Sequence, residues 1–165
     1  MIVIDITDEQ INLAKTKAEE MGRLRNSIRR GEGNVAGFLG EIIFAKHFNG
    51  TINNTYDYDV IVKGKKVDVK TKETTVIPEP YYFATVAGYN IKQKCDYYYF
   101  VRVNIKEKKA YLLGGLSKSG FYKEAIFYKE GDLDPTSNLG WTFRANCYNV
   151  EISKLKQSKK FDKSI

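Results

Sequence analysis

The stretch from 56 to 73, YDYDVIVKGKKVDVKTKE, constrains the fold more than any other part of the chain. Val and Ile alternate with polar residues on both sides of Lys63 and Gly64, a pattern typical of two strands joined by a two-residue turn. Counting outward from that turn places Asp59 opposite Asp68 on one face of the hairpin. The prediction depends on the register, because a three-residue turn would put the two acids on opposite faces.

The two carboxylates predict a cation between them. Opposite residues of a hairpin have Cβ atoms ~5 Å apart, and like charges at that distance destabilise a sheet. Lys70 is two residues beyond Asp68 and shares its face, so two acids and one ammonium group meet on one patch. Oxygen ligands of this kind favour a divalent metal ion. The alternative is a surface hairpin in which Asp68 and Lys70 form a solvated ion pair.

The composition indicates one globular domain covering residues 1–165. Hydrophobic residues make up 42% of the chain, which excludes the disordered class. No apolar run is long enough to cross a membrane, and the first residues lack the basic start and apolar core of a signal peptide. We therefore expect a cytoplasmic protein with no membrane partner. Cys95 and Cys147 are isolated, which predicts buried thiols rather than a zinc or iron–sulfur site.

Positive charge is concentrated in three segments. The net charge is +7, but the segments 22–34, 63–73 and 153–165 together carry +10, so the rest of the chain carries −3. Basic segments in an otherwise mildly acidic protein favour a polyanion partner, most simply nucleic acid, and the alternative is a set of unrelated solvated faces. The basic residues expected to contact nucleic acid are Arg23, Arg25, Arg29, Arg30, Lys63, Lys65 and Lys72.

A first helix is predicted from Asp8 towards Ile28. Thr7 and Gln10 form a capping box at its start, and apolar residues follow at helical spacing. The arginines near its end suit a helix C-terminus electrostatically and could equally reach phosphates. The glycine-rich stretch beyond them matches neither GxGxxG nor a P-loop and follows a helix rather than a strand, so it does not predict nucleotide binding.

A second helix is predicted from Asn34 to Phe48, and it places Glu41 on an apolar stripe. The residues three and four positions away are apolar or glycine, so no basic neighbour on the helix can pair with this carboxylate. Glu41 therefore needs a cap or a distant Lys as its partner, or it faces the same metal ion as the two aspartates. His47, the only histidine, is expected at the surface or in packing, and a single histidine argues against most histidine-based catalysis.

Further strands and one short helix are predicted in the second half of the chain. The segment 96–103 is apolar or aromatic on both faces, which is typical of a central strand covered on both sides. The glycine pair 114–115 is expected to end the next strand, and Ser117 to cap a short helix that reaches Ala125. The basic tail after Ser153 is expected to form a helical turn and then fray. The other predicted strands are Tyr81–Ala87, Ala110–Leu113, Ile126–Tyr128, Trp141–Phe143 and Cys147–Ile152.

One set of polar residues shares a recognisable spacing: a glutamate on a helix, an aspartate, eight further residues, and then Asp-x-Lys. The set consists of Glu41, Asp59, Asp68, Val69 and Lys70. This spacing resembles the catalytic core of the PD-(D/E)XK nuclease superfamily, and the resemblance covers residues 34–103. The proline that precedes the first aspartate in that family is Tyr58 here.

The resemblance implies an α/β protein with a restriction-endonuclease-like core, in which a mixed central β-sheet is flanked by α-helices. It also implies Mg²⁺ as the cofactor, with Mn²⁺ as a substitute ion. Asp59, Asp68 and the Val69 carbonyl would hold the ion, and Glu41 would bind it directly or through water. Lys70 would orient the attacking water and stabilise the scissile phosphate.

The sequence therefore predicts a metal-dependent nuclease that hydrolyses phosphodiester bonds, most simply a DNA endonuclease. A non-catalytic nucleic-acid-binding or inhibitory protein on the same fold is the alternative. A Holliday-junction resolvase and an RNA-directed nuclease also fit a basic chain of this size. An enzyme this small that cuts both strands would suit a two-fold homodimer.

Overall fold

The computed structural model describes residues 1–24 and 34–165. The strands of its main sheet are β1 (Ile2–Asp5), β2 (Thr51–Ile52), β3 (Val60–Val62), β4 (Lys65–Glu73), β6 (Tyr97–Asn104) and β7 (Lys109–Ser117). The strands of a second sheet are β5 (Phe83–Ala87), β8 (Ile126–Tyr128) and β9 (Cys147–Glu151). The helices are α1 (Asp8–Leu24), α2 (Val35–Phe48), α3 (Lys118–Glu124) and α4 (Ser158–Asp162), with short 3₁₀ helices at Gly88–Lys92 and Ile152–Lys154.

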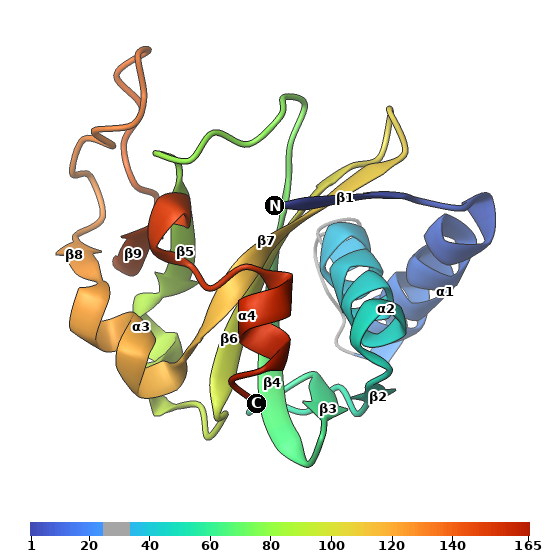
Figure 1. Cartoon of the computed structure of the whole chain (residues 1–165). Coiled ribbons are helices and arrows are strands. Elements are labelled where there is room, and N and C mark those ends of the chain that lie inside the picture. Colours follow the sequence, from blue (N-terminus) through green and yellow to red (C-terminus); the bar gives the residue numbers. More distant parts are fainter. Residues whose placement is uncertain (25–33) are drawn as a thin grey trace.

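The fold is mixed α/β, and its layers are seen in Figure 1. The main sheet has the order β1-β7-β6-β4-β3-β2, with β4 and β6 parallel and the other neighbours antiparallel. Helices α1 and α2 cover one face of this sheet, whereas the second sheet, in the order β5-β9-β8, lies with α3 on the other side. The predicted mixed sheet flanked by helices is therefore confirmed. Within the described ranges, every helix is too short or too polar to span a bilayer.

Strand β6 is the central, doubly covered strand that the sequence predicts. All its residues after Tyr97 are buried, because its two faces belong to two different cores. Tyr99 and Val101 pack on the side of α2, whereas Tyr98 and Phe100 pack against the second sheet and α3. An apolar strand without alternation is thus explained by burial on both faces.

The hairpin of β3 and β4 has the predicted register. Lys63 (φ 49°) and Gly64 (φ 76°) both adopt the left-handed region that a two-residue hairpin turn requires, and Val60 lies opposite Val67. Strand β3 is short, so β4 continues well beyond it towards Glu73. Within the part of the chain that the structure describes, β3 is the only strand on that side of β4. From Asp68 onward, the backbone of β4 therefore has no neighbouring strand on that side among the described residues.

Helix α1 begins with the predicted capping box. The Thr7 backbone N–H donates to Gln10 Oε1 (3.0 Å), and the Gln10 N–H donates to Thr7 Oγ1 (3.1 Å). The predicted extension of this helix to Ile28 lies outside the described residues. Helix α2 also begins as predicted, after Asn34, and ends at Asn49 in a left-handed conformation.

The expected end of β7 at its glycine pair is wrong. The strand continues through Gly114 and Gly115 to Ser117, because the C-terminal segment pairs with it: the Gly115 N–H donates to Lys156 O (2.9 Å), and the Lys156 N–H donates to Gly115 O (3.1 Å). A Cβ on Gly115 would lie 2.6 Å from both Phe161 and the Tyr98 carbonyl. The glycines allow this close approach and do not break the strand.

The expected fraying of the C-terminal tail is also wrong. Helix α4 places Phe161 in the main core, where its ring contacts the rings of Phe44, Phe48 and Tyr99. The tail is ordered because burial of Leu155 and Phe161, together with the backbone pairing of Lys156 with Gly115, opposes the entropy of ordering this segment. The basic residues of this tail therefore flank a packed helix.

The remaining predictions in the second half of the chain have mixed outcomes. The predicted strand at 81–87 is confirmed as β5, but it belongs to the second sheet and pairs with β9. Ser117 caps α3 as predicted, accepting a hydrogen bond from the Gly120 N–H (3.1 Å). The predicted strand at 141–143 is wrong, since this segment makes only one isolated bridge, between Thr142 and Leu133. Cys95 and Cys147 are buried free thiols, as predicted.

Candidate active site

Asp68 lies in the middle of β4 with only 2% of its surface exposed. Its Oδ1 atom accepts a hydrogen bond from Gln93 Nε2 (3.0 Å), and its Oδ2 atom lies 2.5 Å from Lys70 Nζ. Oδ2 receives no well-aligned hydrogen bond from the described residues, so the ammonium group is its principal protein partner. The alternative of a solvated Asp68–Lys70 pair on the surface is wrong, because this carboxylate is buried.

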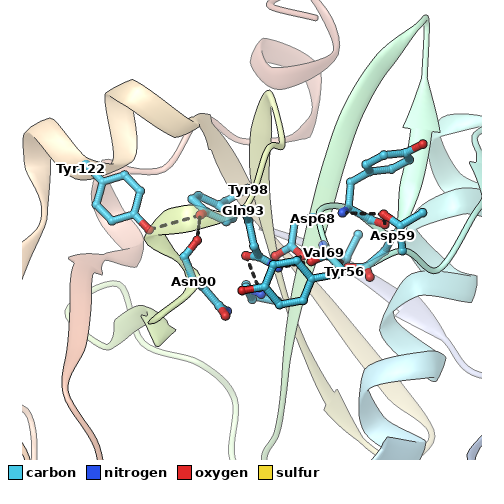
Figure 2. A network of polar contacts seen from close by, with 11 residues as sticks. Tyr56, Asp59, Asp68, Val69, Asn90, Gln93, Tyr98 and Tyr122 are labelled. Atoms are coloured by element: carbon cyan, nitrogen blue, oxygen red, sulfur yellow. Dashed lines mark hydrogen bonds and ion pairs between the residues drawn. The ribbon is translucent and has the colours of Figure 1, made fainter. Parts of the chain in front are cut away.

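Asp59 lies one residue before β3, opposite Asp68 in the continued register. Its Oδ2 atom accepts a hydrogen bond from the Val69 backbone N–H (2.8 Å), on the side of β4 that β3 no longer covers. Figure 2 shows this contact beside the Asp68 carboxylate. The two acids therefore meet at the point where the hairpin opens.

Glu41 approaches the same point from helix α2. The helix passes so close to β4 that a Cβ on Gly40 would collide with the Thr71 side chain. Glu41 is buried, and its Oε2 atom accepts a hydrogen bond from the Asn54 side-chain amide. It makes no ion pair within the described residues, so its partner is neither a helix cap nor a distant Lys.

The three carboxylates form one electrostatic cluster. Burial raises the pKa of Glu41 from 4.5 to about 7, with a further upward contribution from Asp68, while Asn54 and Lys17 oppose the rise. Burial also raises the pKa of Asp59, and both other carboxylates add to the effect. The pKa of Asp68 is raised by burial and lowered by Lys70 and then by Gln93. At neutral pH the cluster therefore binds protons or requires a cation.

A hollow of about 260 Å³ lies between α2 and the segment that leads to β3. Glu41 and Asp59 line it together with Asn54, Tyr56 and Phe38. Lys70 faces a second, smaller hollow of about 50 Å³ between the main sheet and the second sheet. The Glu41 and Asp59 carboxylates are thus reached from the first hollow and the Lys70 ammonium group from the second.

The donor set fits a hard divalent ion by its chemistry. Within residues 1–24 and 34–165, no three His, Cys, Asp or Glu side chains already converge closely enough to hold a metal. The carboxylates are turned onto the Val69 N–H, the Gln93 amide and the Asn54 amide. Carboxylate and carbonyl oxygens are nevertheless the ligands that Mg²⁺ and Mn²⁺ prefer, and the buried Asp68 Oδ2 has a lone pair without an aligned donor.

The sequence gives no sign of Gln93, which is central to the site. Its Nε2 atom donates to the Tyr56 carbonyl (2.8 Å) as well as to Asp68. The short helix that precedes it is fixed to β6, because the Tyr98 hydroxyl donates to the Asn90 carbonyl (3.2 Å), as Figure 2 shows. Gln93 and Asn54 both lie in irregular segments, where no periodic pattern could have marked them.

The structure separates the residues that were expected to bind nucleic acid. Lys72 lies on β4 beyond Lys70, and Lys65 is exposed at the hairpin turn. Lys63 forms an ion pair with Asp162 of α4 (2.9 Å), so it serves to hold the C-terminal helix. Of the arginines, Arg23 lies in α1 with its side chain outside the described part of the chain, and the others lie outside the described residues: Arg25, Arg29 and Arg30.

His47 is exposed on α2, and its ring packs edge-to-face with the Phe48 ring, with the ring centres 4.7 Å apart. It is therefore a surface residue with a packing contact, as predicted.

The chain matches no protein-family model and no curated protein. The site has to be interpreted from its own geometry.

Proposed function

We propose that this protein is a metal-dependent nuclease that hydrolyses phosphodiester bonds, most simply those of DNA. One observation carries the proposal: three buried carboxylates, each with a raised pKa, meet at the open end of a hairpin, and a lysine ammonium lies 2.5 Å from one of them. Such a cluster favours binding of a divalent cation, and the lysine beside it favours an anionic substrate.

We assign a role to each side chain of the cluster. Asp59, Asp68 and the Val69 carbonyl would hold Mg²⁺ or Mn²⁺, with Glu41 binding directly or through water. The bound ion would lower the pKa of a water molecule and neutralise charge on the phosphate. Lys70 would orient the attacking water and place its charge beside the scissile phosphate. Gln93 is a positioning residue, because it donates to the Asp68 carboxylate.

Two features of the fold support a restriction-endonuclease-like core. The acidic hairpin continues directly into β4, which pairs in parallel with the buried strand β6. Helix α2 packs across β4 and supplies the third carboxylate from the opposite side. The site thus combines two strands and one helix of a single compact core.

A second candidate is a nucleic-acid-binding protein without catalytic activity. It is favoured by the hydrogen bonds that already occupy the acids, since Val69, Gln93 and Asn54 hold them as they would in a purely structural network. Calorimetry with Mg²⁺ and Mn²⁺, with and without DNA, separates the candidates. A nuclease should give a heat of metal binding in these titrations. If no heat of metal binding is measurable, either without or with DNA, the non-catalytic binder is favoured.

Cleavage assays test the proposal directly. We expect Mg²⁺ or Mn²⁺ to support cleavage of at least one substrate from a panel of duplex, single-stranded and branched DNA and single-stranded RNA. Asp68→Asn and Lys70→Met should reduce the rate at least about 100-fold, because each removes a group acting at the reacting phosphate.

Lys46→Met is the matched control, because Lys46 is exposed in the last turn of α2 and lies outside the site. It should cleave at the wild-type rate. Full activity in folded Asp68→Asn and Lys70→Met would remove the proposed active site. The same substrate panel distinguishes a DNA endonuclease from a junction resolvase or an RNA-directed enzyme, and gel filtration tests the proposed homodimer.

A further inference from the structure

A second cationic feature lies next to the candidate active site. Lys72 in β4 and Arg102 in β6 are directly opposite each other in the parallel pairing of these strands. Opposite residues of neighbouring strands point to the same face, and alternation places Asp68 and Lys70 on that face as well. Asp68, Lys70 and Lys72 therefore follow one another along β4, with Arg102 beside Lys72, on the face of the main sheet that points towards the second sheet.

Among the described residues, this pair of cations has no acid at ion-pair distance. Burial lowers the pKa of Arg102, and burial followed by the Arg102 charge lowers the pKa of Lys72. Asp134 opposes both shifts from beyond ion-pair distance. A buried cation whose nearest acid lies beyond ion-pair distance favours an anion at this position.

The second sheet holds the guanidinium group in place. Arg102 is only 8% exposed, its Nη2 atom donates to the Phe83 carbonyl at the start of β5 (3.1 Å), and its charge lies 5.6 Å from the centre of the Tyr82 ring. Lys72, in contrast, is exposed at the rim of the gap between the two sheets. The pair thus combines one fixed, buried cation with one exposed cation at the entrance, as a preorganised anion site would.

The hollow beside this pair has the size of a single phosphate group. Lys70, Lys72 and Arg102 line a space of about 50 Å³, which has room for roughly three or four water molecules. Lys70 and Lys72 are two residues apart on one strand, a separation of ~6.6 Å, which is close to that of neighbouring phosphates along one nucleic-acid strand. A base is too large for this space, whereas the oxygens of one phosphate fit.

We infer that Lys72 and Arg102 bind the phosphate next to the scissile one, so that the backbone of one nucleic-acid strand runs along β4 past the mouth of this hollow, with its bases outside. This inference rests on the proposed function for the position of the scissile phosphate at Lys70. It adds a role for the second sheet, which fixes Arg102, and it defines the path of the substrate strand along β4.

The test measures binding without cleavage. Anisotropy of a short fluorescein-labelled oligothymidylate, in EDTA, gives the affinity over a range of salt concentrations. Lys72→Met and Arg102→Gln should each weaken binding roughly tenfold at low salt, because each removes a charge-assisted contact. Lys46→Met, which removes an exposed charge from α2, should leave binding within about twofold of the wild type.

The salt dependence tests whether both residues contact one phosphate. Each phosphate contact contributes about 0.7 to the slope of log affinity against log salt for a single strand. The double variant should therefore lose about 0.7, whereas two independent phosphate contacts would remove about 1.4. A loss of about 1.4 would overturn the shared site. Wild-type affinity and slope in Lys72→Met would overturn the whole inference, even if Arg102→Gln failed to fold.

Failure of this inference is distinguishable from failure of the proposed function. If the slope falls as expected but Lys70→Met still cleaves, the phosphate site stands and the catalytic assignment fails. If cleavage depends on Lys70 and the folded double variant keeps the wild-type affinity and slope, the phosphate site fails alone.

Discussion

Replacing Glu41 by Gln should stabilise the protein at high pH while it abolishes cleavage. The carboxylate is buried, its partner is the Asn54 amide, and its pKa is raised from 4.5 to about 7. The folded protein therefore binds this proton more tightly than the unfolded chain does. Stability from this group is fully present below pH 4.5 and is lost as the pH rises to about 7.

The pKa difference sets the size of the effect. The rise in pKa from 4.5 to about 7 corresponds to about 3 kcal/mol of unfolding free energy. The wild-type protein loses this stability between low pH and pH 8.5. Gln imitates the protonated form and can still accept the hydrogen bond from Asn54. We therefore expect Glu41→Gln to be more stable than wild type by about 3 kcal/mol at pH 8.5, and by less than about 0.5 kcal/mol at pH 4.5.

Urea unfolding followed by circular dichroism, in EDTA at the two pH values, measures this difference. Glu20→Gln is the matched control, because Glu20 is exposed on α1, and it should change stability by less than about 0.5 kcal/mol at either pH. A Glu41→Gln protein that is less stable than wild type at pH 8.5, or equally stabilised at both pH values, would refute the electrostatic description of the cluster.

Three further predictions concern the metal, Gln93 beside the Asp68 carboxylate, and the C-terminal tail. Saturating Mg²⁺ or Mn²⁺ at pH 8.5 should raise the melting temperature of wild type more than that of Asp68→Asn, and its binding at pH 7 should release protons, which calorimetry in buffers of different ionisation enthalpy detects. Equal thermal shifts in the two proteins would place the ion elsewhere. Gln93→Leu should move the rising limb of the cleavage pH profile to higher pH, because Gln93 lowers the pKa of Asp68; an unmoved profile would leave Gln93 a packing role only. Phe161→Ala should lower the unfolding free energy by about 3–5 kcal/mol in urea, and a loss below about 1 kcal/mol would show that the tail does not anchor in the core.

The features that the sequence predicts well are local or periodic. The Lys63-Gly64 pair specifies a two-residue turn through its backbone conformation, and alternation then determines the register that brings Asp59 opposite Asp68. The capping box at Thr7 is equally local. Glu41 could be singled out because a carboxylate on an apolar helix face requires a partner, whatever that partner is.

The features that the sequence does not reveal depend on contacts between distant segments. The glycines of β7 resemble a strand end until the C-terminal segment pairs with Gly115, and the charged tail resembles a frayed end until Phe161 reaches the aromatic core. Gln93 and Arg102 gain their roles only from what faces them, the Asp68 carboxylate and the Phe83 carbonyl. Side chains of this kind have no periodicity or spacing that marks them in advance.

The central claim is that the acids at the open end of the hairpin hold a divalent ion beside Lys70. A crystal of the wild-type protein soaked in Mn²⁺, with the ion located by its anomalous scattering, tests it most directly. The proposal predicts one ion bound by the Asp59 and Asp68 carboxylates, with the Lys70 ammonium alongside. The proposal would be contradicted if, at saturating Mn²⁺, no ion lay between the two carboxylates and they still accepted hydrogen bonds from the Val69 N–H and the Gln93 amide.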